Sequence, residues 1–342
     1  MSDSEASMPA DIVVVGAGLA GSAVAAVLAR RGLAVTVVDP YTEFPSMFRA
    51  EKIEPNQADL FRRLGLFDGV EPATRLIREI IHARGGRVVY RRKIEQFGIA
   101  YCDIVNSVRS QIPAQVDFRH TRVESIAPDA RRPAVVLAGG ERIEGRLVVV
   151  ATGMFGQLTQ GLGVARDMVK EELSMVFGFM LERADGAPFA FDAVTYRPET
   201  TAEKVGYLTL FRMGQFMRGN LFTYWPLRDA LTQEMRRDPV AVLGRVLPGL
   251  DAVIGRYGVA GKVEPFKIDL YRTRDPALPG VVLIGDAFQS VCPSTGMGQT
   301  KVQGCLNFCV RGLGDLSTAA GVACDERPTR WASRGCHATR PC

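Results

Sequence analysis

The sequence has few of the residues that build metal sites and acid–base triads. Its three histidines, His82, His120 and His337, stand at no metal-ligand or triad spacing from a Cys, Asp or Ser. The net charge is +5, but no run or helical stripe of basic residues accompanies it. We therefore expect no nucleic-acid-binding surface, whereas a basic chain suits an anionic small molecule. We assign no metal ligand and no catalytic side chain, and the oligomeric state stays open.

The sequence also lacks a secretory leader and a clear membrane span. Its cysteines number seven, an odd total, and without a leader this favours a reducing, cytoplasmic setting. The apolar stretch from Ile12 to Ala29 approaches the length of a span, but it contains three glycines. It follows Asp3, Glu5 and Asp11, which have the wrong charge for a leader. We expect a cytoplasmic protein without an integral membrane segment.

The rest of the composition is that of an ordinary globular protein. The chain has 342 residues, of which 47% are hydrophobic and 23% are charged. This excludes a disordered chain, a collagen and a small disulfide scaffold. The length is sufficient for two domains.

The first sixty residues carry a complete nucleotide-binding pattern. Ile12–Val15 is a β-branched run typical of a buried strand, and the glycine-rich turn 16–21 follows at once. Ser22–Arg31 reads as a helix, and Ala34–Val38 reads as a second buried strand that ends at Asp39. Strand, G-x-G-x-x-G, helix, strand and acid in this order predict a dinucleotide-binding βαβ unit.

Each part of this unit has a physical role. Gly16 permits the tight turn, Gly18 lets a pyrophosphate approach the backbone, and Gly21 lets the helix pack on the strand. The helix N-terminus attracts the phosphates, and the terminal acid accepts hydrogen bonds from a ribose diol but repels a 2′-phosphate. The candidate cofactor-binding residues are those of the turn and the acid: Gly16, Ala17, Gly18, Leu19, Ala20, Gly21 and Asp39. The motif alone fits NAD or FAD, and a glycine turn in another βαβ unit is the alternative.

The next segment carries a family resemblance. Arg49 follows the acid, and a helix-like run from Asn56 ends in Leu64-Gly65-Leu66. With these residues the chain resembles the FAD-dependent aromatic hydroxylases, the class A flavin monooxygenases typified by para-hydroxybenzoate hydroxylase. The resemblance implies that Arg49 contacts the flavin cofactor. The alternative is an arginine in a surface loop.

A second motif lies near the carboxyl end. Gly280–Ile284 reads as a buried strand, followed by Gly285-Asp286-Ala287 and a Pro-x-x-Gly-x-Gly turn. The resemblance implies that Asp286 binds a ribityl hydroxyl of FAD. It also implies that Gly296 and Gly298 open a helix whose N-terminus stabilises the negative charge of reduced flavin. A plain strand-to-helix turn is the alternative, and Phe288, where the family usually has His, leaves the subfamily open.

Three features between the motifs add to the expected site. Leu147–Val150 reads as a strand that ends in Ala-Thr-Gly rather than the family's Asp-Gly, which leaves pyridine-nucleotide handling open. The resemblance implies that Arg109, on an expected helix over Tyr101–Ile112, lies near the flavin diphosphate; a solvated position is equally compatible. The resemblance also implies that Val123, in the next expected strand, lies near the adenine.

The middle of the chain has a different character. Met175–Leu181, Val205–Phe211 and Asn220–Trp225 are short, aromatic and β-branched, as in antiparallel strands, and Asp229–Leu247 returns to a helical pattern. The resemblance implies a sheet that roofs the flavin. The aromatic residues of this part either line that site or pack in its core: Phe177, Phe179, Phe189, Phe191, Phe211, Phe216, Phe222, Tyr224 and Trp225.

We therefore predict an α/β protein, with a Rossmann-type FAD-binding domain and an inserted β-rich substrate domain. The FAD-binding domain is expected over 1–174 and 266–301, and the substrate domain over 175–265. Residues 302–342 form an atypical tail, rich in Cys, Arg and Gly, which reads as truncated or frameshifted. A metal-binding tail is the alternative, although no C-x-x-C pair is present.

The resemblance implies an FAD-dependent monooxygenase. NADPH or NADH would be the transient reductant, and O2 would react through a flavin C4a-hydroperoxide to hydroxylate a small aromatic or apolar substrate. The expected partners are that substrate and O2. The alternatives are a reductase of the geranylgeranyl-reductase type and a non-catalytic FAD-binding protein. A flavin halogenase is disfavoured because the tryptophan-rich motif of that group is absent.

Overall fold

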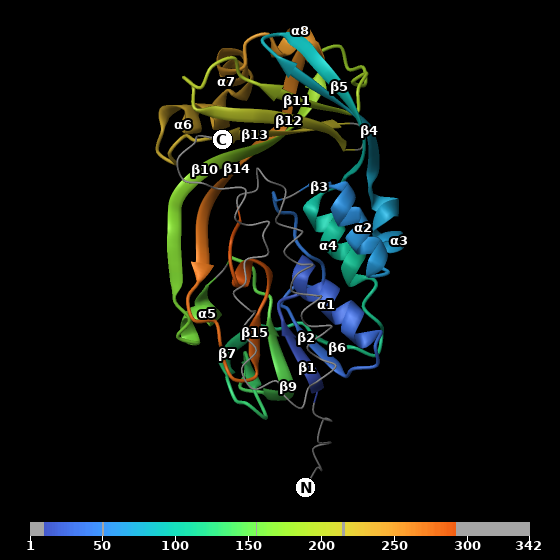
Figure 1. The fold of residues 1–342 in the computed structure, drawn as a ribbon, viewed down its shortest axis with the longest axis vertical. Coiled ribbons are helices and arrows are strands. Elements are labelled where there is room, and N and C mark those ends of the chain that lie inside the picture. The colour runs from blue at the N-terminus through green and yellow to red at the C-terminus, as the bar shows by residue number, and fades with distance from the viewer. Residues whose placement is uncertain (1–9, 50, 155, 214–215, 292–342) are drawn as a thin grey trace.

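Two sheets form the framework of the protein in a computed structural model (Figure 1). The structure describes residues 10–49, 51–154, 156–213 and 216–291. Within these residues one sheet has seven strands and the other has eight. The predicted fold class, a Rossmann-type unit combined with a β-rich part, is confirmed.

The seven-stranded sheet is built around the amino-terminal strand. Its strands are β1 (Ala10–Val15), β2 (Val35–Val38), β6 (Asp117–Arg119), β7 (Val123–Ala127), β8 (Ala134–Leu137), β9 (Arg142–Val150) and β15 (Val281–Leu283). β1 lies between β2 and β9 and is parallel to both, while β7 and β8 continue from β9 as an antiparallel meander. β15 returns from the far end of the chain to pair in parallel with β9. Both glycine motifs therefore follow strands of one sheet.

The central strand is buried on both faces. Ile12 and Val14 pack in a cluster with residues of helices α1 and α4, whereas Val13 and Val15 pack in a separate cluster on the other face. This double burial explains the uninterrupted β-branched run. The helices of this part are α1 (Leu19–Ala29), α2 (Pro55–Arg63), α3 (Phe67–Val70), α4 (Tyr101–Arg109) and α5 (Gln157–Gly161), with 3-10 turns η1 (Glu71–Ala73) and η2 (Gly285–Ala287).

The eight-stranded sheet lies across one end of this unit (Figure 1). In spatial order its strands are β14 (Tyr257–Thr273), β10 (Arg166–Arg183), β13 (Phe216–Thr223), β12 (Val205–Met213), β11 (Ala193–Arg197), β4 (Arg75–Arg84), β5 (Arg87–Gly98) and β3 (Lys52–Ile53). Helices α6 (Ala230–Arg237), α7 (Pro239–Val246) and α8 (Leu250–Ile254) cover one face, and the other face is turned toward α1 and β15 (Figure 1).

Several element boundaries differ from the prediction. The helix expected over 229–247 is two helices, because Asp238 caps the second one by accepting a hydrogen bond from the Ala241 N–H, at 3.0 Å, and Pro239 opens it. Strands β3, β4 and β5 join the eight-stranded sheet, although they lie in the range assigned to the FAD-binding domain. The domain boundaries themselves stay a prediction. Among the described residues, no helix has the length and apolar character needed to cross a membrane.

Candidate cofactor-binding site

The glycine turn between β1 and α1 is packed so closely that two of its positions require glycine. Gly16 has φ +93°, and a Cβ there would lie 2.8 Å from the Ala151 carbonyl oxygen at the end of β9. A Cβ on Gly21 would lie 1.9 Å from the carbonyl oxygen of Gly16. The turn is therefore pressed between its own helix and the neighbouring strand, as the motif predicted.

Gly18 is different because the protein leaves room beside it. It is the N-cap residue of α1, it is extended, and no side chain caps the helix. A Cβ on Gly18 would meet only the Phe44 ring, at 4.0 Å. The N-terminus of α1, with Leu19 and Ala20 in its first turn, thus presents N–H groups to a ligand that approaches Gly18.

Asp39 and Arg109 form a buried ion pair beside the turn. The Arg109 Nη2 lies 2.9 Å from Asp39 Oδ1, and the two side chains are only 7% and 9% exposed. Asp39 Oδ2 accepts from the Ala17 N–H at 2.8 Å, and Arg109 Nε donates to the Ala17 carbonyl at 2.7 Å. Arg109 is thus not a solvated helix residue but braces both the turn and the acid. Asp39 Oδ2 retains acceptor capacity for one ribose hydroxyl.

The glycine turn at residues 16–21 and the distant Gly285-Asp286-Ala287 segment meet at one place. A Cβ on Gly285 would lie 3.2 Å from the Cβ of Ala20, so η2 stands directly against the first turn of α1. Next to it, Arg49 Nη1 lies 3.2 Å from Asp286 Oδ2, and these side chains are 16% and 30% exposed. Arg49 and Asp286, each predicted separately, are therefore neighbours. Their roles toward FAD stay predictions.

Sequence analysis missed a group of polar residues on the other side of Asp286. The Tyr271 hydroxyl donates to the Asp286 carbonyl at 2.7 Å, and burial raises the pKa of this phenol to about 12, so it stays protonated. Arg166 lies over the Tyr271 ring, with Cζ 4.4 Å from the centroid. Among the residues that the structure describes, the buried Nε and Nη2 of Arg166 and Oγ1 of Thr152 have no hydrogen-bond partner. Such unsatisfied groups suit a site that a polar ligand completes.

The remaining predicted residues lie as follows. Val123 opens β7 and packs against the cluster that contains Val38, the residue before the acid. Gly296 and Gly298 lie outside the described residues, as does the tail from 302. Within the described part of the chain, no group of three or more His, Cys, Asp or Glu is arranged to hold a metal ion.

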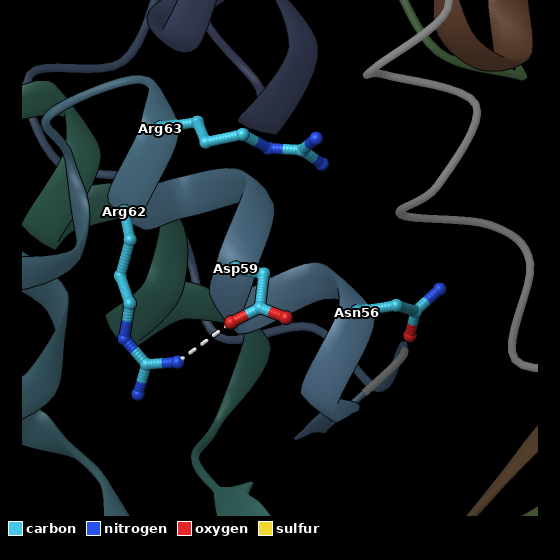
Figure 2. A pocket seen from close by; sticks show the side chains of 4 residues that line it. All are labelled: Asn56, Asp59, Arg62 and Arg63. Carbon is cyan, nitrogen blue, oxygen red and sulfur yellow. Dashed lines mark hydrogen bonds and ion pairs between the residues drawn. The ribbon is translucent and has the colours of Figure 1, made fainter.

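A surface hollow on α2 is separate from these motifs. Figure 2 shows the residues that line it, Asn56, Asp59, Arg62 and Arg63, with Arg62 turned toward Asp59 at 2.9 Å. The Arg62 and Asp59 side chains are largely exposed. We assign no function to this hollow.

The open face of the eight-stranded sheet is partly aromatic and partly polar. On β13, Met217 and Leu221 pack in the cluster with helix α7, so the alternate residues Arg218, Asn220 and Phe222 point to the opposite face. The rings of Phe222 and Tyr207 are stacked there at 4.5 Å. Asn220 is 8% exposed, and its buried Oδ1 has no hydrogen-bond partner within the described part of the chain.

This arrangement sorts the aromatic residues of the middle segment. Phe177, Phe179, Phe189 and Trp225 belong to the cluster beneath the helices, so for them core packing is confirmed. Phe222, in contrast, packs on the open face with the cluster around Phe48 and Val176. Along β10, the alternation of residues places Phe177 and Phe179 in the cluster beneath the helices and Val176 on the open face.

Comparisons with known proteins agree with this geometry. A family model described as "FAD binding domain" matches residues 9–307. The 3-amino-4-hydroxybenzoate 2-monooxygenase of Streptomyces platensis is 32% identical over 165 residues, which cover 44% of this chain and 41% of that enzyme. The chain thus matches about two fifths of the length of that curated relative.

Solved structures are similar in fold. The p-nitrophenol 4-monooxygenase of Pseudomonas putida DLL-E4 superposes with a TM-score of 0.73 at 18% identity, covering 90% of this chain and 80% of that one. PqsL of P. aeruginosa, in complex with 2-aminobenzoylacetate, gives 0.71 at 19% identity, with coverage of 92% and 90%.

Proposed function

Because the chain belongs to the FAD binding domain family, as the resemblance predicted, we propose that it is an FAD-dependent monooxygenase that uses NADPH or NADH and O2 to hydroxylate a small aromatic substrate. The observation that carries this proposal is the convergence of the amino-terminal glycine turn and the Gly285-Asp286-Ala287 segment. Gly285 stands against Ala20, and Asp286 pairs with Arg49 from a third segment. One extended dinucleotide can therefore contact all three segments.

The residues at this place fit FAD. The uncapped N-terminus of α1 and the space beside Gly18 would take the pyrophosphate, and Asp39 would take a ribose hydroxyl. Asp286 and Arg49 would hold the ribityl chain and a neighbouring polar edge of the cofactor. When bound, FAD supplies the redox chemistry with the reductant and O2, whereas the chain binds, orients and excludes water.

The proposed substrate class draws on the relatives and on the open face of the eight-stranded sheet, which we call the roof sheet. The names of the two similar monooxygenases specify 3-amino-4-hydroxybenzoate and p-nitrophenol, which are small aromatic rings with polar substituents. Here, Tyr207 and Phe222 offer ring faces, and Asn220 offers a buried amide. We infer that the substrate is an aromatic ring that bears a hydroxyl or amino group.

The first test is whether the purified chain carries FAD and consumes O2. We expect heat to release a fluorescent flavin, and a phenol or an aminophenol to stimulate NAD(P)H oxidation with matching O2 uptake. Reduction of a prenyl double bond without O2 uptake would favour the reductase alternative. Bound FAD without any substrate-stimulated oxidation would favour the non-catalytic alternative, and a protein that binds no FAD would refute the proposal.

Replacing Asn220 with leucine tests the predicted substrate contact. Leucine has the same number and branching of heavy atoms as asparagine but no amide, so a ring hydroxyl loses its partner in a buried place. We expect the KM for a hydroxylated substrate to rise about tenfold to a hundredfold. Binding of a matched ring with methyl in place of hydroxyl is expected not to weaken, nor is binding of FAD. An equal loss for both rings would mean that Asn220 only shapes the sheet.

A further inference from the structure

A buried ion network joins the roof sheet to the segment that carries Arg49. Arg218 Nε, on β13, lies 2.6 Å from Glu51 Oε2, and Arg218 Nη2 lies 2.9 Å from Glu264 Oε2 on β14. The side chains of Arg218 and Glu51 are 4% and 6% exposed, whereas Glu264 is 44% exposed. A guanidinium that is always charged is expensive to bury, so Arg218 cannot lose Glu51 without a local rearrangement.

The network is fitted into the sheet by close packing. The Arg218 guanidinium lies over the Phe48 ring, with Cζ 4.8 Å from the centroid. A Cβ on Gly178, on the adjacent strand β10, would lie 2.6 Å from both Arg218 Nη2 and the Phe48 ring. Gly178 therefore makes the space in which Arg218 and Phe48 stack. Arg218 thus contacts Phe48, the residue before Arg49, and Glu51, which lies two residues after it.

Arg49 lies between Phe48 and Glu51 in the chain, and its side chain extends to Asp286. Its Nη1 reaches Asp286 at 3.2 Å, and its Cζ lies 5.1 Å from the centroid of Phe266. The Phe266 ring in turn meets Phe48 edge-on, with centroids 6.5 Å apart. The Glu51 carbonyl is also fixed, because it accepts from the Ile99 N–H at 3.2 Å. The direction of Arg49 is therefore set by its neighbours on the roof sheet.

We propose that Arg218 is a positioning residue, which holds Glu51 and Phe48 so that Arg49 stays at Asp286, in the place proposed for FAD. Its effect on FAD rests on the proposed function, but its effect on the Arg49 segment does not. Loss of Arg218 removes the hydrogen bond that holds the Glu51 carboxyl, at 2.6 Å, and the guanidinium that lies over the Phe48 ring, so this segment is no longer held against the sheet. Arg49 then leaves Asp286, although Arg218 itself touches neither of them.

A double-mutant cycle on FAD affinity tests whether Arg218 acts through Arg49. The FAD dissociation constant is measured by fluorescence quenching for the wild type, Arg49→Met, Arg218→Met and the double variant. We expect each single change to weaken binding about tenfold to a hundredfold. The double variant should bind within about threefold of Arg49→Met alone, because the second change removes nothing further. Unchanged affinity in Arg218→Met, or losses that multiply, would overturn the proposal.

Hydrogen exchange of the Arg49 segment tests the same idea without FAD. Arg218→Met should increase exchange in peptides that cover residues 47–53, and Arg245→Met, which removes an arginine from an exposed pair with Glu234, should not. If Arg218→Met does not fold, Arg218→Lys, which keeps the charge but loses the two-pronged contact, takes its place with a smaller expected increase. Unchanged exchange would refute the positioning role, whereas a wild type that binds no FAD would refute only the proposed function.

Discussion

Gly18→Ala is expected to weaken FAD binding about a hundredfold while leaving the fold intact. Gly18 has φ −68°, which alanine adopts freely, and the added methyl would meet only the Phe44 ring at 4.0 Å. The protein thus has room for this methyl. A pyrophosphate bound at the N-terminus of α1 would occupy the same space, so the methyl would clash with it. Unfolding free energy should change by less than about 1 kcal/mol, the usual effect of alanine at an N-cap.

Two other glycines make the comparison decisive. Gly21→Ala should lose both binding and about 3 kcal/mol of unfolding free energy, because its Cβ would lie 1.9 Å from a backbone oxygen. Gly244, in α7, has open space around the position of a Cβ. Gly244→Ala should therefore gain up to about 1 kcal/mol of unfolding free energy without any change in FAD binding. Urea unfolding and FAD titration of the three variants provide the data. Wild-type affinity in Gly18→Ala would mean that no ligand approaches this turn.

The amino-terminal unit was predictable because its signals are local. The run Ile12–Val15 is buried on both faces of one sheet, and Gly21 faces the carbonyl oxygen of Gly16 within the same turn. In the same way, the carboxyl-terminal strand β15 reads directly from its apolar residues. Such patterns depend on neighbours in the chain, which a single sequence displays.

The contacts between segments could not be predicted in this way. Nothing in the residues around Arg49 or Arg109 identifies Asp286 or Asp39 as a partner, because these pairs are set by how the sheet is assembled. Strand β5 was also missed, since Arg87–Lys93 is exposed throughout and has no period-two alternation. In contrast, the break between α6 and α7 is visible in the sequence, because Asp238-Pro239 is a typical start of a new helix.

The stability of the protein should depend on pH through Glu51. Burial raises the pKa of the Glu51 carboxyl from its ordinary 4.5 to about 7, and the attraction of Arg218 offsets only part of this effect. Because the pKa of Glu51 is higher in the folded than in the unfolded state, protonated Glu51 contributes to the free energy of unfolding. This contribution is complete below pH 4.5 and is lost as the pH rises through 7. A difference of about 2.5 pH units corresponds to about 3 kcal/mol.

Glu51→Gln isolates this contribution, because glutamine keeps the shape but does not titrate. The free energy of unfolding of both proteins is measured in urea between pH 4.5 and 8.5. The value of the wild type minus that of the variant should fall by about 3 kcal/mol across this range and level off above pH 8. Glu234→Gln, in an exposed pair with Arg245, should follow the wild type throughout. A difference that rises with pH would mean that Arg218 dominates and lowers the pKa of Glu51. The carboxylate would then be a permanent anion in the network, and the roof sheet would hold the Arg49 segment by charge at every pH in this range.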